Sequence, residues 1–129
     1  MLFRLALPDS PERRPDVAFV SYQRWPHSRK IPRTPAWEVT PDLAVEVVSP
    51  SNEAGKVLAK VREYFRAGVQ VVWVVWPATE EVYVYESPTR IRVLERTDEL
   101  EGGTLLPGFR LPVATLFEED AAAETKNGQ

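Results

Sequence analysis

The sequence predicts an α/β (α+β) fold, a mixed β-sheet with one main helix packed on it. Twelve prolines interrupt the 129 residues, and a long helix fits only into the proline-free interval 51–76. Short apolar stretches of strand length stand before and after that interval. A helix that joins two such stretches makes a right-handed crossover, so these two strands are expected to be parallel neighbours.

Three strands are predicted before the helix, at residues 2–7, 17–22 and 43–48, and a Pro-Asp pair opens each of the last two. Alternation in the third strand puts Ala44, Glu46 and Val48 on one face. An ionised carboxylate is rare in such an apolar run unless it is paired or bound to a metal. Glu46 is therefore either a site residue near the end of the strand or an outward-facing glutamate on a half-exposed strand.

The helix is expected to begin after Ser51 or Asn52 as the N-cap and to stop at Gly68. Its three- and four-residue apolar spacing predicts a buried stripe of Ala54, Val57, Leu58, Val61, Tyr64 and Phe65.

At about 100° per residue, Lys60 lies roughly 100° and Lys56 roughly 140° from the centre of the stripe at Val61. Lys60 therefore borders the buried face and can direct its ammonium towards Glu46, whereas Lys56 is expected to point to solvent. We expect Val57, Val61 and Phe65 to share one core cluster with the VVWVVW segment that follows the helix.

Three strands are predicted after the helix, at residues 71–76, 82–85 and 91–94. The continuous apolar run VVWVVW is expected to be covered on both faces of the sheet. The next two segments alternate, with prolines in their turns, which indicates antiparallel strands. We expect residues 1–117 to form a single domain and the acidic residues 118–129 to form a flexible tail.

Composition excludes several kinds of chemistry. The chain has no cysteine and one histidine, His27, which rules out disulfides, thiolate metal sites and multi-histidine sites. The sequence assigns His27 no role. With no long apolar run and no signal peptide, we expect a cytoplasmic protein without a membrane partner.

Two further acids and one loop are candidates for binding. Asp16 and Asp42 each follow a proline at a strand start, where Asp is commonly a turn or capping residue but can also be a ligand. The loop YQRWPHSRKIPR can contact phosphates and stack on bases, or remain simply solvated. Its cationic residues are Arg24, Arg29, Lys30 and Arg33.

Four segments together resemble the Uma-type restriction endonuclease family, which belongs to the PD-(D/E)XK nuclease superfamily. They are RRPDVAFVSYQR, PDLAVEVVSPSN, a K-x3-Y-x3-GV spacing that starts at Lys60, and VVWVVWP. The resemblance runs from about Phe3 to Phe117 and begins without the helical segment that precedes this region in the family. It implies a restriction-endonuclease-like mixed sheet flanked by helices.

The resemblance also implies site residues. Asp16 matches the motif aspartate and Glu46 the acidic residue of the ExK motif. Val48 stands at the lysine position of that motif, and members of this type take the lysine from the following helix, here Lys60. We therefore expect Mg²⁺, with Mn²⁺ as an alternative, on Asp16, Glu46 and the carbonyl of Val47. The carboxylates of Asp16 and Glu46 should then lie within about 6 Å of each other.

The expected function is that of a Mg²⁺-dependent endonuclease that hydrolyses DNA phosphodiester bonds with metal-activated water. Asp16, Glu46 and Lys60 would be catalytic, the basic loop would steer the DNA, and a homodimer is left open. The alternative is a truncated, non-catalytic protein of nuclease fold that binds nucleic acid or a protein partner. Lys56 and Trp76 stand at positions that are commonly Asp in the family.

Overall fold

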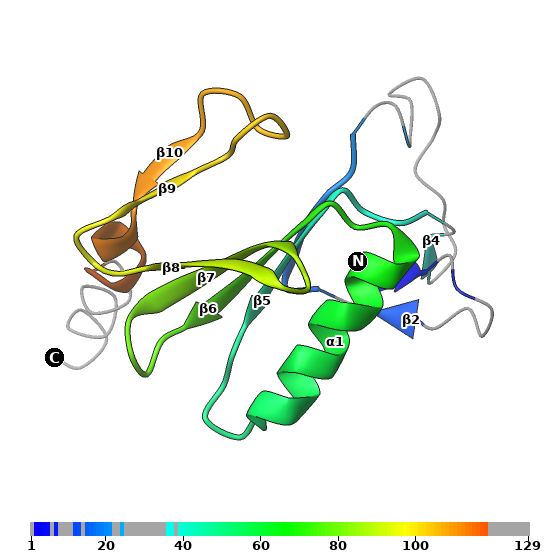
Figure 1. The fold of residues 1–129 in the computed structure, drawn as a ribbon, viewed down its shortest axis with the longest axis horizontal. Coiled ribbons are helices and arrows are strands. Elements are labelled where there is room, and N and C mark those ends of the chain that lie inside the picture. Colours follow the sequence, from blue (N-terminus) through cyan, green and yellow to red (C-terminus); the bar gives the residue numbers. More distant parts are fainter. Residues whose placement is uncertain are drawn as a thin grey trace, which may run out of the picture.

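The computed structural model describes residues 2–5, 7, 12–13, 15–21, 24, 36–37 and 39–118. Its main feature is a five-stranded sheet with one long helix, α1 (Ala54–Ala67), on one face (Figure 1). The strand order is β3-β5-β6-β7-β8. The strands are β3 (Val17–Phe19), β5 (Leu43–Val47), β6 (Val71–Trp76), β7 (Glu81–Ser87) and β8 (Arg90–Leu94). This arrangement confirms the predicted mixed sheet with one main helix.

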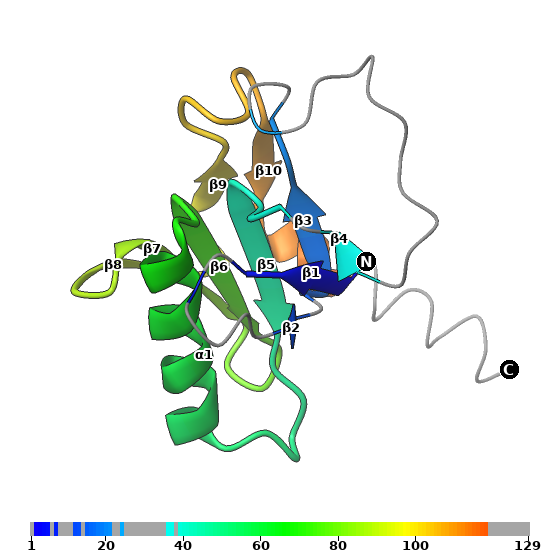
Figure 2. The same cartoon turned by 90° about the vertical axis from the view of Figure 1, so that its right-hand side faces the viewer.

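The strand directions also follow the prediction. β5 and β6 are parallel and are joined by α1, while β3, β7 and β8 pair antiparallel with their neighbours. Figure 2 shows β5 between β6 and β3, with α1 to one side. β6 has the predicted bounds, but β3 ends earlier than predicted, at Phe19. The amide of Ser21 donates to the carboxylate of Asp42 (2.7 Å), so the chain leaves the strand ladder there.

Two small sheets were not predicted. β1 (Leu2–Arg4) is shorter than the predicted strand 2–7 and pairs with β2 (Glu12–Arg13) and β4 (Ala36–Trp37) rather than with the main sheet. β9 (Glu99–Glu101) pairs with β10 (Arg110–Pro112). These strands have two or three residues each, too few for a periodic pattern to reveal them.

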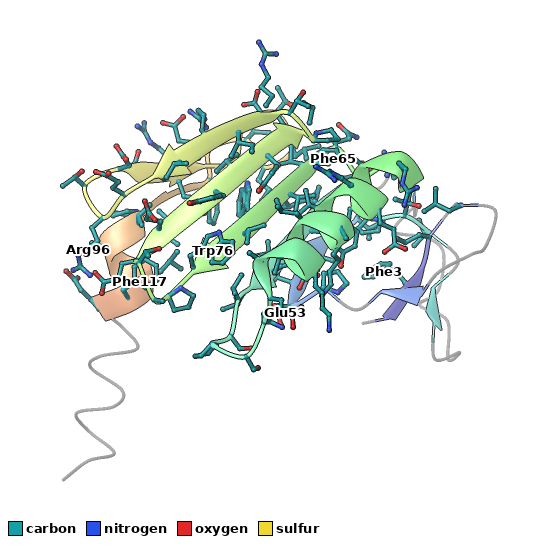
Figure 3. The ribbon with its side chains drawn as sticks, turned by 60° about the horizontal axis from the view of Figure 1, so that its bottom comes forward. Phe3, Glu53, Phe65, Trp76, Arg96 and Phe117 are labelled. Atoms are coloured by element: carbon teal, nitrogen blue, oxygen red, sulfur yellow. The ribbon has the colours of Figure 1, made fainter. Side chains whose placement is uncertain are left out.

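The main sheet carries a core on each face. On the α1 side, Val57 and Val61 pack with Val72 and Val74, and Phe65 joins them half-buried. On the other face, β5, β6 and β7 pack against the segment that contains Leu100, Val113 and Phe117. In Figure 3, Phe65 and Phe117 are labelled with the sheet between them.

The two cores correct one expectation. VVWVVW does not lie in a single cluster, because alternate side chains of a strand point to opposite faces of the sheet. Val72, Val74 and Trp76 face α1, whereas Val71, Trp73 and Val75 belong to the second core. The prediction that β6 is covered on both faces is confirmed.

The C-terminal end of α1 matches the prediction and the N-terminal end does not. Gly68 has a left-handed φ of 104°, and its N–H donates to the carbonyl of Phe65. The N-cap is Glu53 rather than Ser51 or Asn52. Asn52 instead accepts hydrogen bonds from the amide and the hydroxyl of Ser49, both at 2.8 Å, so its side chain closes the preceding loop.

The buried side of α1 is rotated from the predicted stripe. Leu58, a predicted core residue, is 41% exposed, and Ala54 is exposed as well. The buried positions are Val57, Val61, Glu63, Tyr64 and Ala67. Tyr64 is buried and Lys60 lies at the margin of the buried surface, both as predicted, so the rotation affects mainly Ala54 and Leu58.

The predicted tail lies mostly outside the described residues, since the description ends at residue 118. In the part of the chain that is described, no helix is long and apolar enough to span a membrane.

Candidate active site

Glu46 is a buried carboxylate near the C-terminal end of β5. It pairs in register with Val74 of β6, and Ala44 and Val74 belong to the core beneath α1. Strand alternation therefore directs the Glu46 side chain towards the helix and leaves it 8% exposed. The alternative of an outward-facing glutamate on a half-exposed strand is wrong.

Two side chains from α1 approach the two oxygens of Glu46. The hydroxyl of Tyr64 donates to Oε1 at 2.6 Å, and Nζ of Lys60 lies 3.6 Å from Oε2. Residues four apart on a helix share a face, so one stretch of α1 supplies both contacts. The structure thus brings Glu46 together with Lys60 and adds Tyr64, which the sequence had placed in the buried stripe of the helix but not at the site.

The surroundings of Glu46 shift the pKa of its carboxyl group. Burial raises the pKa of the Glu46 carboxyl above its ordinary value, because the charged form loses solvation. The Tyr64 hydrogen bond and the positive charge of Lys60 act in the opposite direction, and the negative charge of Asp16 raises the pKa further. A cation bound next to Glu46 would therefore stabilise its ionised form.

Asp16 lies at the start of β3, on the strand next to Glu46. Val17 pairs with Val45 in the antiparallel register, so Asp16 stands beside the end of β5 that carries Glu46 and Val47. Its Oδ2 accepts a hydrogen bond from the amide of Val47 at 2.6 Å, and the residue is exposed. The predicted 6 Å approach of the two carboxylates stays a prediction.

The donor atoms here suit one class of metal. The described residues contain no group of three or more His, Cys, Asp or Glu side chains that could hold an ion. Mg²⁺ is commonly held by one or two carboxylates, with water and substrate phosphate as its other ligands. Asp16, Glu46 and the carbonyl of Val47 offer only oxygen atoms. They fit a Mg²⁺ ion that also binds substrate and do not fit a closed structural site.

A cavity of about 450 Å³ opens beside Glu46, between the end of β5 and α1. Lys56, Lys60 and Arg66 supply three cationic side chains to its lining, against the acidic Glu46 and Glu63. Lys56 is exposed, as predicted, yet it lines the same cavity as Lys60. The cavity therefore offers positive charge to an anionic group next to the Glu46 carboxylate.

Asp42, at the other end of β5, has a different set of partners. It is 1% exposed and accepts hydrogen bonds from the amide of Ser21 (2.7 Å) and from Nε2 of Gln70 (2.8 Å). Nε of Arg24 completes an ion pair with its Oδ1 at 2.9 Å. Of the two roles left open for Asp42, these contacts support the structural one.

Arg24 makes several further hydrogen bonds next to Asp42. Besides Asp42, its guanidinium donates to the carbonyls of Thr40 (3.1 Å), Pro41 (3.1 Å) and Gly68 (2.8 Å). The sequence suggested that Arg24 contacts DNA, whereas in the structure its guanidinium points at protein acceptors. The other members of that loop, Arg29, Lys30 and Arg33, and also His27, lie outside the described residues.

Comparisons with known proteins agree with this fold. The sequence matches the Uma2 family, described as "Putative restriction endonuclease", over residues 2–114. No match was found among curated proteins. The fold resembles the crystal structure of a putative nuclease belonging to DUF820 from Anabaena variabilis, with a TM-score of 0.77 and 20% sequence identity. The likeness covers 91% of this chain and 64% of that chain. Since the family match extends over most of the sequence, the chain belongs to the Uma2 family of putative restriction endonucleases.

Proposed function

We propose that the protein is a Mg²⁺-dependent endonuclease that hydrolyses DNA phosphodiester bonds, with Mn²⁺ as an alternative ion. One observation carries the proposal: a buried carboxylate, Glu46, meets a lysine of the following helix at the wall of a cationic cavity. Membership of a restriction endonuclease family supports the same reaction class.

Asp16, Glu46 and the carbonyl of Val47 would hold the metal. When bound, the ion would acidify a water molecule and neutralise charge that develops on the scissile phosphate. Asp16 accepts a hydrogen bond from the Val47 amide, and Glu46 accepts one from the Tyr64 hydroxyl. Lys60 would orient the attacking water with its ammonium group.

Cationic side chains along α1 would contact the DNA backbone. Lys56 and Arg66 line the cavity on either side of Lys60 in sequence, so that a phosphodiester next to Glu46 would meet positive charge in both directions along the helix. Arg29, Lys30 and Arg33 remain proposed as a second contact surface. Arg24 would contribute there by holding its loop to the protein.

The decisive experiment combines plasmid nicking with calorimetric titration of Mg²⁺ and Mn²⁺. We expect the wild type to bind metal and nick DNA, and Glu46→Ala to lose nearly all metal binding, because a single carboxylate seldom holds a strongly hydrated cation. Glu86→Ala, an exposed carboxylate on β7, serves as the matched control and should behave like the wild type.

If the wild type neither binds metal nor nicks DNA, the catalytic proposal is wrong. DNA binding that persists under those conditions would support the non-catalytic alternative.

A further inference from the structure

Tyr64 approaches Glu46 from the protein interior. Its side chain is fully buried in the core beneath α1, with 0% exposure, and it is not among the residues that line the cavity. The 2.6 Å distance from its hydroxyl to Oε1 of Glu46 is that of a strong hydrogen bond to a carboxylate. The packed ring cannot follow the carboxylate if it moves, so the hydroxyl fixes where Oε1 lies.

Lys60 contacts the other oxygen in a looser way. Its Nζ lies 3.6 Å from Oε2, and the side chain is 38% exposed. Glu46 and Lys60 both line the cavity, whereas Tyr64 lies behind it. One oxygen of Glu46 thus faces a buried neutral donor on the core side, and the other faces a partly exposed cation on the cavity side.

We infer that Tyr64 is a positioning residue, which holds Oε1 of Glu46 so that Oε2 is presented to the metal ion that Glu46 and Asp16 are proposed to hold. This inference rests on the proposed metal-dependent function. Lys60 occupies the neighbourhood of Oε2 and competes with the ion by its charge. Two residues of one helix face therefore have opposite effects on metal affinity.

These contacts predict whether each substitution raises or lowers the affinity for the metal. Tyr64→Phe keeps the packed ring and removes only the hydroxyl, so Glu46 loses its anchor and the affinity for Mn²⁺ should fall by about 10-fold or more, as is usual for an outer-shell partner of a metal ligand. Lys60→Met removes a positive charge from Oε2, so the affinity should stay the same or rise. A purely structural role of Tyr64 would lower the melting temperature and leave the affinity unchanged.

The test is a calorimetric Mn²⁺ titration of the full chain as wild type, Tyr64→Phe, Lys60→Met and Tyr85→Phe. Tyr85 is the matched control, because it is a buried tyrosine (3% exposed) of the same core and should leave the affinity within about twofold. Equal affinity in Tyr64→Phe and the wild type overturns the inference alone. Absence of binding to the wild type overturns the proposed metal dependence and the inference with it.

A second measurement does not require Tyr64→Phe to fold. The chain contains four tyrosines, so 3-fluorotyrosine labelling gives four ¹⁹F signals. The Tyr64 signal is identified as the one that Glu46→Gln displaces. Mg²⁺ should shift this signal in the wild type, since the ion changes the charge on the carboxylate that the hydroxyl contacts. Saturation with Mg²⁺ without any shift at this signal contradicts the inference.

Discussion

β5 has a buried acid at each end, and the two acids differ in how completely the protein satisfies them. Asp42 receives two hydrogen bonds and an ion pair from Ser21, Gln70 and Arg24, all within 2.9 Å. Glu46 has one neutral donor at 2.6 Å, and its nearest cation lies at 3.6 Å beside a cavity. A carboxylate with a full set of close partners stabilises the fold, whereas one left incomplete on its open side is available to a ligand.

The largest effect is expected from removing Asp42, the acid with the full set of close partners. Asp42→Ala removes the partner of a partly buried guanidinium and should lower the free energy of unfolding by about 3 kcal/mol, the low end for a broken buried ion pair because Arg24 is partly exposed. Urea denaturation measures it, with Glu86→Ala, which removes an exposed carboxylate, as control. A loss below about 1 kcal/mol would mean that the contacts of Asp42 stabilise the fold no more than an exposed ion pair does, and would contradict the comparison of the two acids.

The second prediction concerns catalysis at the incomplete end. Lys60→Ala should reduce DNA nicking about 10²-fold, near 2.7 kcal/mol of transition-state stabilisation, while metal still binds. Arg62→Ala, an exposed cation of the same helix outside the cavity lining, is the control. Nicking at the wild-type rate by Lys60→Ala would remove this lysine from the reaction.

A smaller effect is expected from removing one of the hydrogen-bond donors to Asp42. Gln70→Ala deletes the bond to Oδ1 of Asp42, which Arg24 still contacts, and should cost about 1 kcal/mol. Thermal and urea unfolding both report the change, and nicking by the folded variant should equal that of the wild type. A cost as large as that of Asp42→Ala would mean that Arg24 depends on Gln70.

The smallest effect is a dependence of stability on pH. The pKa of Glu46 is raised above its ordinary 4.5, so the folded state binds this proton more tightly than the unfolded chain. Its contribution to stability is therefore fully present below 4.5 and is lost as the pH rises through the higher folded pKa. Glu46→Gln should flatten this part of the curve of unfolding free energy against pH. An unchanged slope would mean that other groups cause this pH dependence of stability.

The elements whose signals are local could be predicted from the sequence. β6 is a continuous apolar run, and Gly68 is the natural residue for a left-handed helix end, so both were located correctly. The helix start was missed because Asn52 bonds to Ser49, an interaction that competes with capping. The exposure of Leu58 could not be predicted, because it depends on how α1 is rotated over the sheet, which tertiary packing decides.

In the candidate site, too, features with a local sequence signal could be predicted, and contacts set by tertiary packing could not. Alternation placed Glu46 on the same face of its strand as Ala44, and helical spacing placed Lys60 at the border of the buried face. Which face of the strand the helix covers could not be read from alternation. Tyr64 was predicted as a core residue and as part of the K-x3-Y-x3-GV spacing, and its four-residue offset from Lys60 could also have indicated that it shares the helix face next to Glu46. The partners of Asp42 come from positions 18 to 28 residues away in the chain, and no local pattern predicts such contacts.

The short edge strand β3 has a consequence for how the site persists over time. It is held to β5 by three residue pairs and the bond from Val47 to Asp16, whereas β6 lies between two strands and is covered on both faces. Local opening is easiest where few buried contacts must break, so the amides of Val17–Phe19 should exchange with solvent deuterium long before those of β6. Asp16 thus stands at the start of an edge strand that opens easily, whereas Glu46 stands on the inner strand β5, and an ion shared between them would slow exchange in β3.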